Sequence, residues 1–204
     1  MGKLDTNKRL KRESLLKTAF SIFTDKGVSK TSISEIVEKA GVAKGTFYLY
    51  FKDKYDLKNK LISHQSSLIF KNAIEALNNK EGLDFDDRII FIIDNIINQL
   101  YKDPNLLSFI SKNLSWGIFK HAVTSPENDE DINFKIVYEK MLIEEAPVIF
   151  DNPEVMLFMI VELVSSTIYS AILYQEPVEL EKLKPYLYRT IRMIIKSHEI
   201  EPKE

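Results

Sequence analysis

The feature that most constrains the fold is a pair of short helical patterns separated by a very short turn, within residues 32–51. Ser32 and Glu35 have the spacing of a capping box, in which the serine side chain accepts from the glutamate backbone N–H and the glutamate side chain accepts from the serine N–H. Gly41 is suited to end the first helix, because glycine readily adopts the left-handed conformation. Two residues later a third helix is predicted over about residues 44–50. Two short helices joined by a tight glycine turn are typical of a helix-turn-helix unit.

The rest of the chain is also patterned as helices. Leu16, Phe20 and Phe23 recur at helical spacing before Gly27. Asp53 is placed to cap a long fourth helix that starts at about residue 54, and the polar stretch 78–82 follows it. Further helices are predicted up to Pro104, from Pro104 onward, and at about 134–150, 153–174 and 179–197. With only 6 glycines and 7 prolines, we predict an all-α fold of about nine helices and no strand.

Composition excludes several classes of site. The chain has no cysteine, which excludes disulfides, thiolate metal sites and cysteine nucleophiles. Its three histidines lack metal-ligand spacing, and we find neither a glycine-rich phosphate loop nor a nucleophile–base pair. We therefore expect no enzyme activity, no metal and no cofactor. Residues 1–12 are charged without an apolar segment, so we expect no signal peptide and a cytoplasmic location.

Charge is distributed unevenly along the chain. Residues 1–60 hold 14 lysines and arginines against 7 acidic residues, a formal charge of +7, and the remainder carries −9. A basic first part is typical of a surface that meets a polyanion, although chance clustering of solvated charges gives the same count. In a helix-turn-helix unit the second helix enters the major groove of DNA. Lys44, Thr46, Tyr48 and Tyr50 would present polar groups outward, while Gly45 would let the backbone approach a phosphate or base.

At these residues the chain resembles the TetR family of transcriptional regulators. The resemblance rests on Thr31/Ser32, Ile36, Ala40-Gly41-Val42, Gly45-Thr46-Phe47-Tyr48, Tyr50-Phe51 and Lys54-x-x-Leu57, and it covers roughly residues 10–70. Two positions depart from the family pattern, Ala43 in place of a serine and Tyr55 in place of an acidic residue. The resemblance implies a DNA-binding domain over residues 1–55, linked through the fourth helix to a ligand-binding and dimerisation domain over 56–204. The implied DNA contacts are Ser32, Lys44, Gly45, Thr46, Tyr48, Tyr50 and Lys54, with Lys54 on a phosphate and Tyr48 on either a base or a phosphate.

The last two predicted helices are candidates for a homodimer interface. The segment 155–174 is long enough to cross a bilayer, but Glu162 and several hydroxyl residues interrupt it, so burial between two subunits is the favoured explanation. The resemblance implies a four-helix bundle between subunits, and two-fold symmetry implies a near-palindromic DNA operator. The predicted interface residues are Ser166, Ile168, Ser170, Leu187, Ile191 and Ile194.

Aromatic and flexible apolar residues are frequent in the acidic part of the chain. Core packing explains any one of them, whereas the resemblance implies a cavity for a small effector. The candidates for its lining are Phe109, Trp116, Phe119, Tyr138, Met141, Phe158 and Tyr169. These features predict a repressor that a small apolar or amphipathic effector releases from its operator. The alternatives are a ligand-independent DNA-organising or cell-division factor on the same scaffold, and a membrane-associated helical protein.

Overall fold

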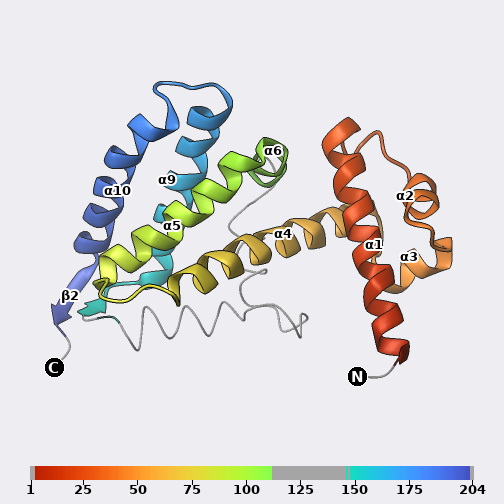
Figure 1. The fold of residues 1–204 in the computed structure, drawn as a ribbon, viewed down its shortest axis with the longest axis horizontal. Coiled ribbons are helices and arrows are strands. Elements are labelled where there is room, and N and C mark those ends of the chain that lie inside the picture. The colour runs from red at the N-terminus through yellow and green to blue at the C-terminus, as the bar shows by residue number, and fades with distance from the viewer. Residues whose placement is uncertain (1–2, 112–145, 147, 203–204) are drawn as a thin grey trace. The chain divides into compact units, whose positions relative to one another are not determined.

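The computed structural model, shown in Figure 1, describes residues 3–111, 146 and 148–202 and divides the chain into two compact units. The first unit is residues 1–64 and the second is residues 65–204, so the boundary falls inside one long helix. In order, the described elements are α1 (Lys3–Lys26), α2 (Ile33–Ala40), α3 (Lys44–Tyr50), α4 (Lys54–Leu77), α5 (Phe85–Lys102), α6 (Pro104–Ser111), β1 (Val148–Phe150), α9 (Pro153–Leu173), α10 (Leu180–Ser197) and β2 (Glu199–Pro202). The predicted mainly helical architecture is confirmed.

Helix ends follow the local sequence signals. Gly41 has a φ of 67°, and its backbone N–H closes α2 on the carbonyls of Glu38 and Val37. The carboxylate of Asp53 accepts hydrogen bonds from two backbone N–H groups at the start of α4, at 2.7 and 2.8 Å, as predicted. α5 ends at Lys102, and Pro104 opens α6, where its missing N–H leaves no bond unmade. Capping therefore fixes where the short helices of the first unit begin and end.

The first unit has a compact apolar core of its own. α1 supplies Leu15, Leu16 and Ala19, which are at most 2% exposed. α2 adds the buried Ile36, and α3 adds Phe47 at 0%. Each of these leucine, isoleucine and phenylalanine side chains contributes about 1.5–3 kcal/mol by leaving water. Because helices as short as α2 and α3 are not stable alone, this packing holds them in place.

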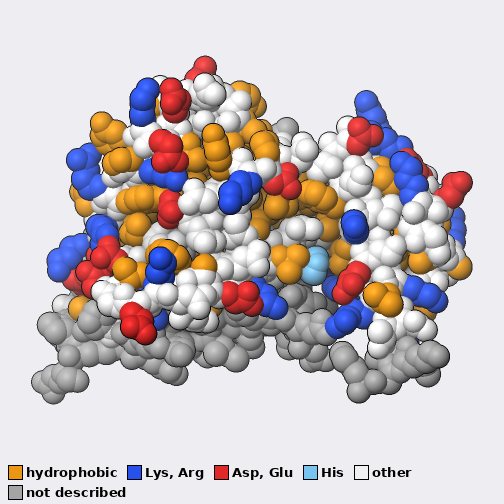
Figure 2. Space-filling view, viewed as in Figure 1, with side chains coloured by type: hydrophobic (Ala, Val, Ile, Leu, Met, Phe, Trp, Pro, Cys, Tyr) orange, Lys and Arg blue, Asp and Glu red, His pale blue; other side chains and the backbone are white. Residues whose placement is uncertain are grey.

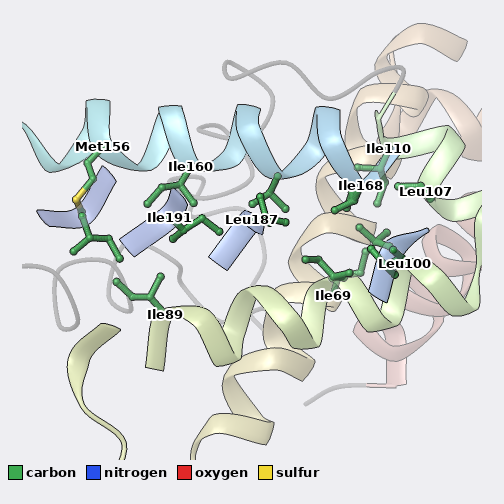
Figure 3. Packing of buried hydrophobic residues seen from close by; sticks show 14 of the residues in the cluster. Ile69, Ile89, Leu100, Leu107, Ile110, Met156, Ile160, Ile168, Leu187 and Ile191 are labelled. Atoms are coloured by element: carbon green, nitrogen blue, oxygen red, sulfur yellow. The ribbon is translucent and has the colours of Figure 1, made fainter. Parts of the chain in front are cut away.

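The second unit is built around a larger apolar cluster. Figure 3 shows how its side chains converge: Met156, Ile160 and Ile168 of α9 face Ile89 and Leu100 of α5, with Leu187 and Ile191 of α10 close by. α10 is also fixed to α5 by polar contacts. The Tyr188 hydroxyl donates to the Asp94 carboxylate, and Arg192 forms ion pairs with Asp86 and Asp87. Burial, together with the bond to Asp94, raises the pKa of Tyr188 above its usual value.

Two short strands contradict the prediction that the chain has none. β1 and β2 pair in antiparallel fashion, with Ile149 opposite Glu201. The predicted helix over 134–150 is wrong at its end, because residues 148–150 form β1, while most of its range lies outside the described residues. β-branched and aromatic side chains favour extended backbone, and flanking prolines at 147 and 153 prevent a continuous helix there.

Candidate functional site

Specific hydrogen bonds attach the helix-turn-helix to α1. The Ser14 hydroxyl donates to the carbonyl of Ala40 at 3.0 Å, next to the glycine turn. The Lys26 ammonium donates to the Glu35 carboxylate at 2.6 Å, which lowers the pKa of Glu35. These contacts hold both ends of α2 against α1, so the position of α3 relative to α1 is defined within this unit.

The predicted capping box is half formed. The Ser32 hydroxyl accepts from the backbone N–H of Glu35 at 3.1 Å, as the spacing requires. The Glu35 carboxylate binds Lys26 and Lys39 instead of returning to Ser32. Ser32 therefore has a structural role at the start of α2, and its side chain is exposed beside that cap. A contact between Ser32 and DNA remains a prediction.

α3 presents a defined outward face. Phe47 is buried and Phe51, just after the helix, is 1% exposed, so these two rings hold α3 on the core. Away from that core Lys44, Gly45 and Tyr48 are exposed, and the Tyr48 ring contacts the edge of the Phe47 ring, with 5.4 Å between ring centroids. Tyr48 is a helix-surface neighbour of both other predicted DNA-contact residues, since it lies four positions after Lys44 and three after Gly45.

Two other predicted contact residues of α3 are only partly accessible. Thr46 and Tyr50 are half-buried. The Tyr50 hydroxyl donates to the carbonyl of Lys8 at 3.0 Å, which ties α3 to the first part of α1. Ala43 precedes α3 and makes no side-chain cap, in line with the missing hydroxyl noted in the sequence. The exposed polar side chains of α3 are therefore those of Lys44 and Tyr48.

Gly45 has no structural requirement within the protein. A Cβ added to it would meet no heavy atom within 4 Å in the part of the chain that the structure describes. Its φ lies outside the left-handed region, unlike Gly27 and Gly41. Glycine is unfavourable in a helix by about 0.5–1 kcal/mol relative to alanine, so neither packing nor backbone geometry within the described residues explains Gly45. A close contact between Gly45 and DNA remains a prediction.

Lys54 is engaged within the first unit. Its ammonium donates to the carbonyls of Ser29 and Thr31, at 3.0 and 2.9 Å, and lies 5.5 Å from the centroid of the Tyr55 ring. It therefore fixes the segment between α1 and α2 to the start of α4. Figure 2 shows other Lys and Arg side chains distributed over the surface of residues 1–64. The predicted contact of Lys54 with a phosphate is a second role that this geometry leaves untested.

One outward residue of α3 was absent from the sequence prediction. Leu49 is 79% exposed, between the predicted contact residues Tyr48 and Tyr50. The predicted contacts are polar side chains and one glycine, whereas a leucine has no polar group. The signal was its position, since Leu49 lies two residues from Phe47 and two from Phe51 and is therefore out of phase with the apolar face of α3.

The second unit contains a cavity of about 140 Å³ between α4, α5, α6 and α9. The described residues that line it are Ser66, Ile69, Phe70, Ile93, Ile96, Leu100, Ile110, Ser111, Ile160, Val161, Val164, Ser165 and Ile168. The Ser165 hydroxyl is satisfied by the Val161 carbonyl at 2.7 Å. The buried Ser66 Oγ makes no hydrogen bond within the described residues. The wall is thus almost wholly apolar, with one unsatisfied hydroxyl.

The three predicted cavity residues that the structure describes, Phe109, Phe158 and Tyr169, are not among the described residues of this wall. Phe109 is buried but is not among the residues around the cavity, and Tyr169 is half-buried and pairs with the Tyr174 ring. Phe158 is 39% exposed on α9. Trp116, Phe119, Tyr138 and Met141 lie outside the described residues. Among the described residues, aliphatic side chains spaced along facing helices make most of the wall.

The predicted dimer residues need a correction. Ile168, Leu187 and Ile191 are at most 3% exposed within the chain itself, because their stripe faces the core of the second unit. Ile194 is half-buried against the same core, whereas Ser166 is exposed and Ser170 half-buried. The apolar side chains that α9 and α10 do expose are Val155, Phe158, Met159, Tyr186 and Met193. An interface on these helices would use that other face.

α9 is also the helix that passes a simple membrane test. Among the described residues, it alone is long and apolar enough to cross a bilayer, with a mean hydropathy of 1.9. Five of its residues are buried within the second unit, and the Thr167 hydroxyl is bonded to the Leu163 carbonyl at 2.7 Å. Core packing explains one side of its apolar surface.

Within the described residues there is no cluster of three or more histidine, aspartate or glutamate side chains able to hold a metal ion.

Comparison with known proteins places these features in a family. Residues 15–61 match the family model for bacterial regulatory proteins of the tetR family. A curated relative, the uncharacterised HTH-type transcriptional regulator YvdT of Bacillus subtilis, is 35% identical over 91 residues, which are 45% of this chain and 44% of that protein. The probable acrEF/envCD operon repressor of Escherichia coli is 39% identical over 57 residues, covering 28% of this chain and 26% of the relative. The chain thus matches less than half the length of either relative.

Solved structures extend the likeness to the whole fold. The transcriptional regulator FadR of Bacillus subtilis, solved in complex with stearoyl-CoA, superposes with a TM-score of 0.63 over 90% of this chain and 97% of its own, at 17% sequence identity. An identity this low supports the shared fold alone. The helix-turn-helix unit of this chain thus matches the tetR family of bacterial regulatory proteins, and its helical architecture has the fold of a solved regulator.

Proposed function

We propose that this chain is a homodimeric transcriptional repressor that binds a near-palindromic DNA operator. The observation that carries the proposal is the outward face of α3, where Lys44, Gly45 and Tyr48 are exposed on a helix that Phe47 anchors to α1 and α2. In helix-turn-helix proteins this second helix lies in the major groove. The basic first part of the chain supplies the charge that attracts the phosphate backbone. Such a function belongs to the cytoplasm, where the DNA is.

Dimerisation is proposed through the exposed face of α9 and α10. Met159 of α9 and Met193 of α10 are 42% and 65% exposed, and Ser166 on α9 is small enough for a partner helix to approach closely. A stable interface of this kind is expected to bury about 2,000 Å² or more. Two-fold symmetry then sets two copies of α3 about 34 Å apart, or a multiple of it, on the operator.

The cavity is proposed as the effector site. Its volume of about 140 Å³ is close to that of apolar cavities that bind benzene, so it suits a small and largely apolar group. Three of its residues, Ser66, Ile69 and Phe70, belong to α4, the helix that starts in the first unit. An effector that binds one conformational state more tightly shifts operator binding by that difference in affinity alone. The cavity favours this regulated form over a ligand-independent DNA-organising factor.

The proposal is tested by selecting operator sequences from random DNA with the full chain. The expected result is a single inverted repeat, bound by a dimer, with affinity that falls steeply as salt rises. Replacing Lys44 or Tyr48 with alanine should weaken binding by at least tenfold, and Lys44→Ala should leave the melting temperature unchanged. Lys182→Ala, which removes an exposed lysine of α10, should bind as wild type does. The proposed function would be contradicted if the selection enriched no DNA sequence, or if both α3 variants bound the operator with wild-type affinity.

A further inference from the structure

Leu49 is the most exposed large apolar residue that the structure describes, at 79%. Its neighbours in the sequence behave differently, since Phe47 is fully buried and Tyr50 is fixed by its bond to Lys8. The Leu49 side chain is therefore not part of the core. An isolated exposed leucine is common on protein surfaces, so its position on α3 must decide whether it has a function.

That position coincides with the proposed DNA-binding face. Gly45, Tyr48 and Leu49 stand at i, i+3 and i+4, so their side chains share one side of α3. All three are exposed, and the space around Gly45 is open. A leucine on this face contacts whatever surface the face meets. Because residues 1–60 carry a formal charge of +7, that surface is expected to be a polyanion and not an apolar protein or a lipid core.

DNA offers few apolar groups to such a side chain. In the major groove the bases present hydrogen-bond donors and acceptors, and the one apolar group is the C5-methyl of thymine. A leucine has no polar atom with which to read any other base. From its exposure and its place one turn after Gly45, we infer that Leu49 reads a thymine methyl group and so fixes one thymine in each half of the operator. This inference rests on the proposed function and names the base that α3 selects.

The test replaces each thymine of the selected operator, one position at a time, with deoxyuridine. Deoxyuridine keeps the O4 acceptor of thymine and lacks only the methyl group. At one thymine per half-site, wild type should bind about fourfold more weakly, the factor that corresponds to ~0.8 kcal/mol for one buried carbon group. Leu49→Ala should bind thymine and deoxyuridine equally at that position. Leu10→Ala, an exposed leucine of α1, should keep the wild-type discrimination.

The outcomes separate this inference from the proposed function. If wild type enriches no DNA sequence, both fall together. If it binds an inverted repeat but no deoxyuridine lowers the affinity, or if Leu49→Ala discriminates as wild type does, the role of Leu49 is overturned and the function stands. Because the Leu49 side chain is mostly in water, the variant should melt at the wild-type temperature, which excludes misfolding as the cause of a lost preference.

Discussion

Replacing Gly45 with alanine should make the protein more stable and less able to bind its operator. An alanine in helical backbone is favoured over glycine by about 0.5–1 kcal/mol, because glycine loses more conformational freedom on folding. Nothing opposes that gain at this position, since the new Cβ would meet no heavy atom within 4 Å and the backbone needs no left-handed angle. For a unit of 64 residues the gain corresponds to a rise of roughly 2–8 °C in melting temperature.

Operator binding should change in the opposite direction. If DNA approaches the backbone of α3 at Gly45, a methyl group there must be accommodated in a packed interface, at a cost of about 1–3 kcal/mol. The affinity should then fall by roughly 5- to 150-fold at constant salt. Urea unfolding followed by circular dichroism measures the first effect, and fluorescence anisotropy with a labelled operator measures the second.

Gly82 provides the matched control. It also has open space around it, but its φ of 75° is left-handed, and it lies in the second unit. Gly82→Ala should therefore lower stability by about 1–2 kcal/mol while operator affinity stays at the wild-type level. Wild-type affinity in Gly45→Ala would refute the close approach of DNA at this residue, and a loss of stability would refute the account of its backbone.

Three further substitutions test the other proposed sites. Lys54→Ala should weaken binding to all DNA sequences alike and reduce the slope of log affinity against log salt by about 0.9. It should also destabilise the first unit by about 1 kcal/mol, because two carbonyls lose their donor. A salt slope equal to that of wild type would leave Lys54 with its structural role alone. Met159→Glu should sediment as a folded monomer with weakened operator binding. The control Tyr101→Glu, which changes an exposed aromatic residue of α5, should remain dimeric. If Met159→Glu is dimeric at micromolar concentration, the exposed face of α9 is not the dimer interface. Val164→Phe, which narrows the cavity, should still bind the operator but should no longer gain thermal stability from toluene or p-cresol. If these compounds stabilise the variant as much as they stabilise wild type, they bind outside the cavity.

The helix-turn-helix could be predicted from sequence because local interactions determine it. The Ser32 cap, the glycine turn at Gly41 and the Asp53 cap each act within four residues, and the structure has all three. What local sequence could not supply was the partner of each polar side chain. Glu35 and Lys54 find theirs across the unit, on α1 and on the segment before α2. Such pairs depend on how helices distant in sequence are packed, and no spacing rule encodes them.

The second unit was harder to predict because helical periodicity gives a stripe without saying what covers it. The stripe of α10 through Leu187 and Ile191 fits the chain's own core and a partner's surface equally well, and the structure assigns it to the core. Tyr186 lies one position before Leu187, just over a quarter turn from it, and Met193 lies two positions after Ile191, just over half a turn from it. Their side chains are 62% and 65% exposed. A charge at Ile191 would thus be buried without a partner and would unfold the second unit, whereas a charge at Met193 remains in water unless a second subunit covers it. Only the outward face can be mutated to separate association from folding, which is why the dimer must be tested there.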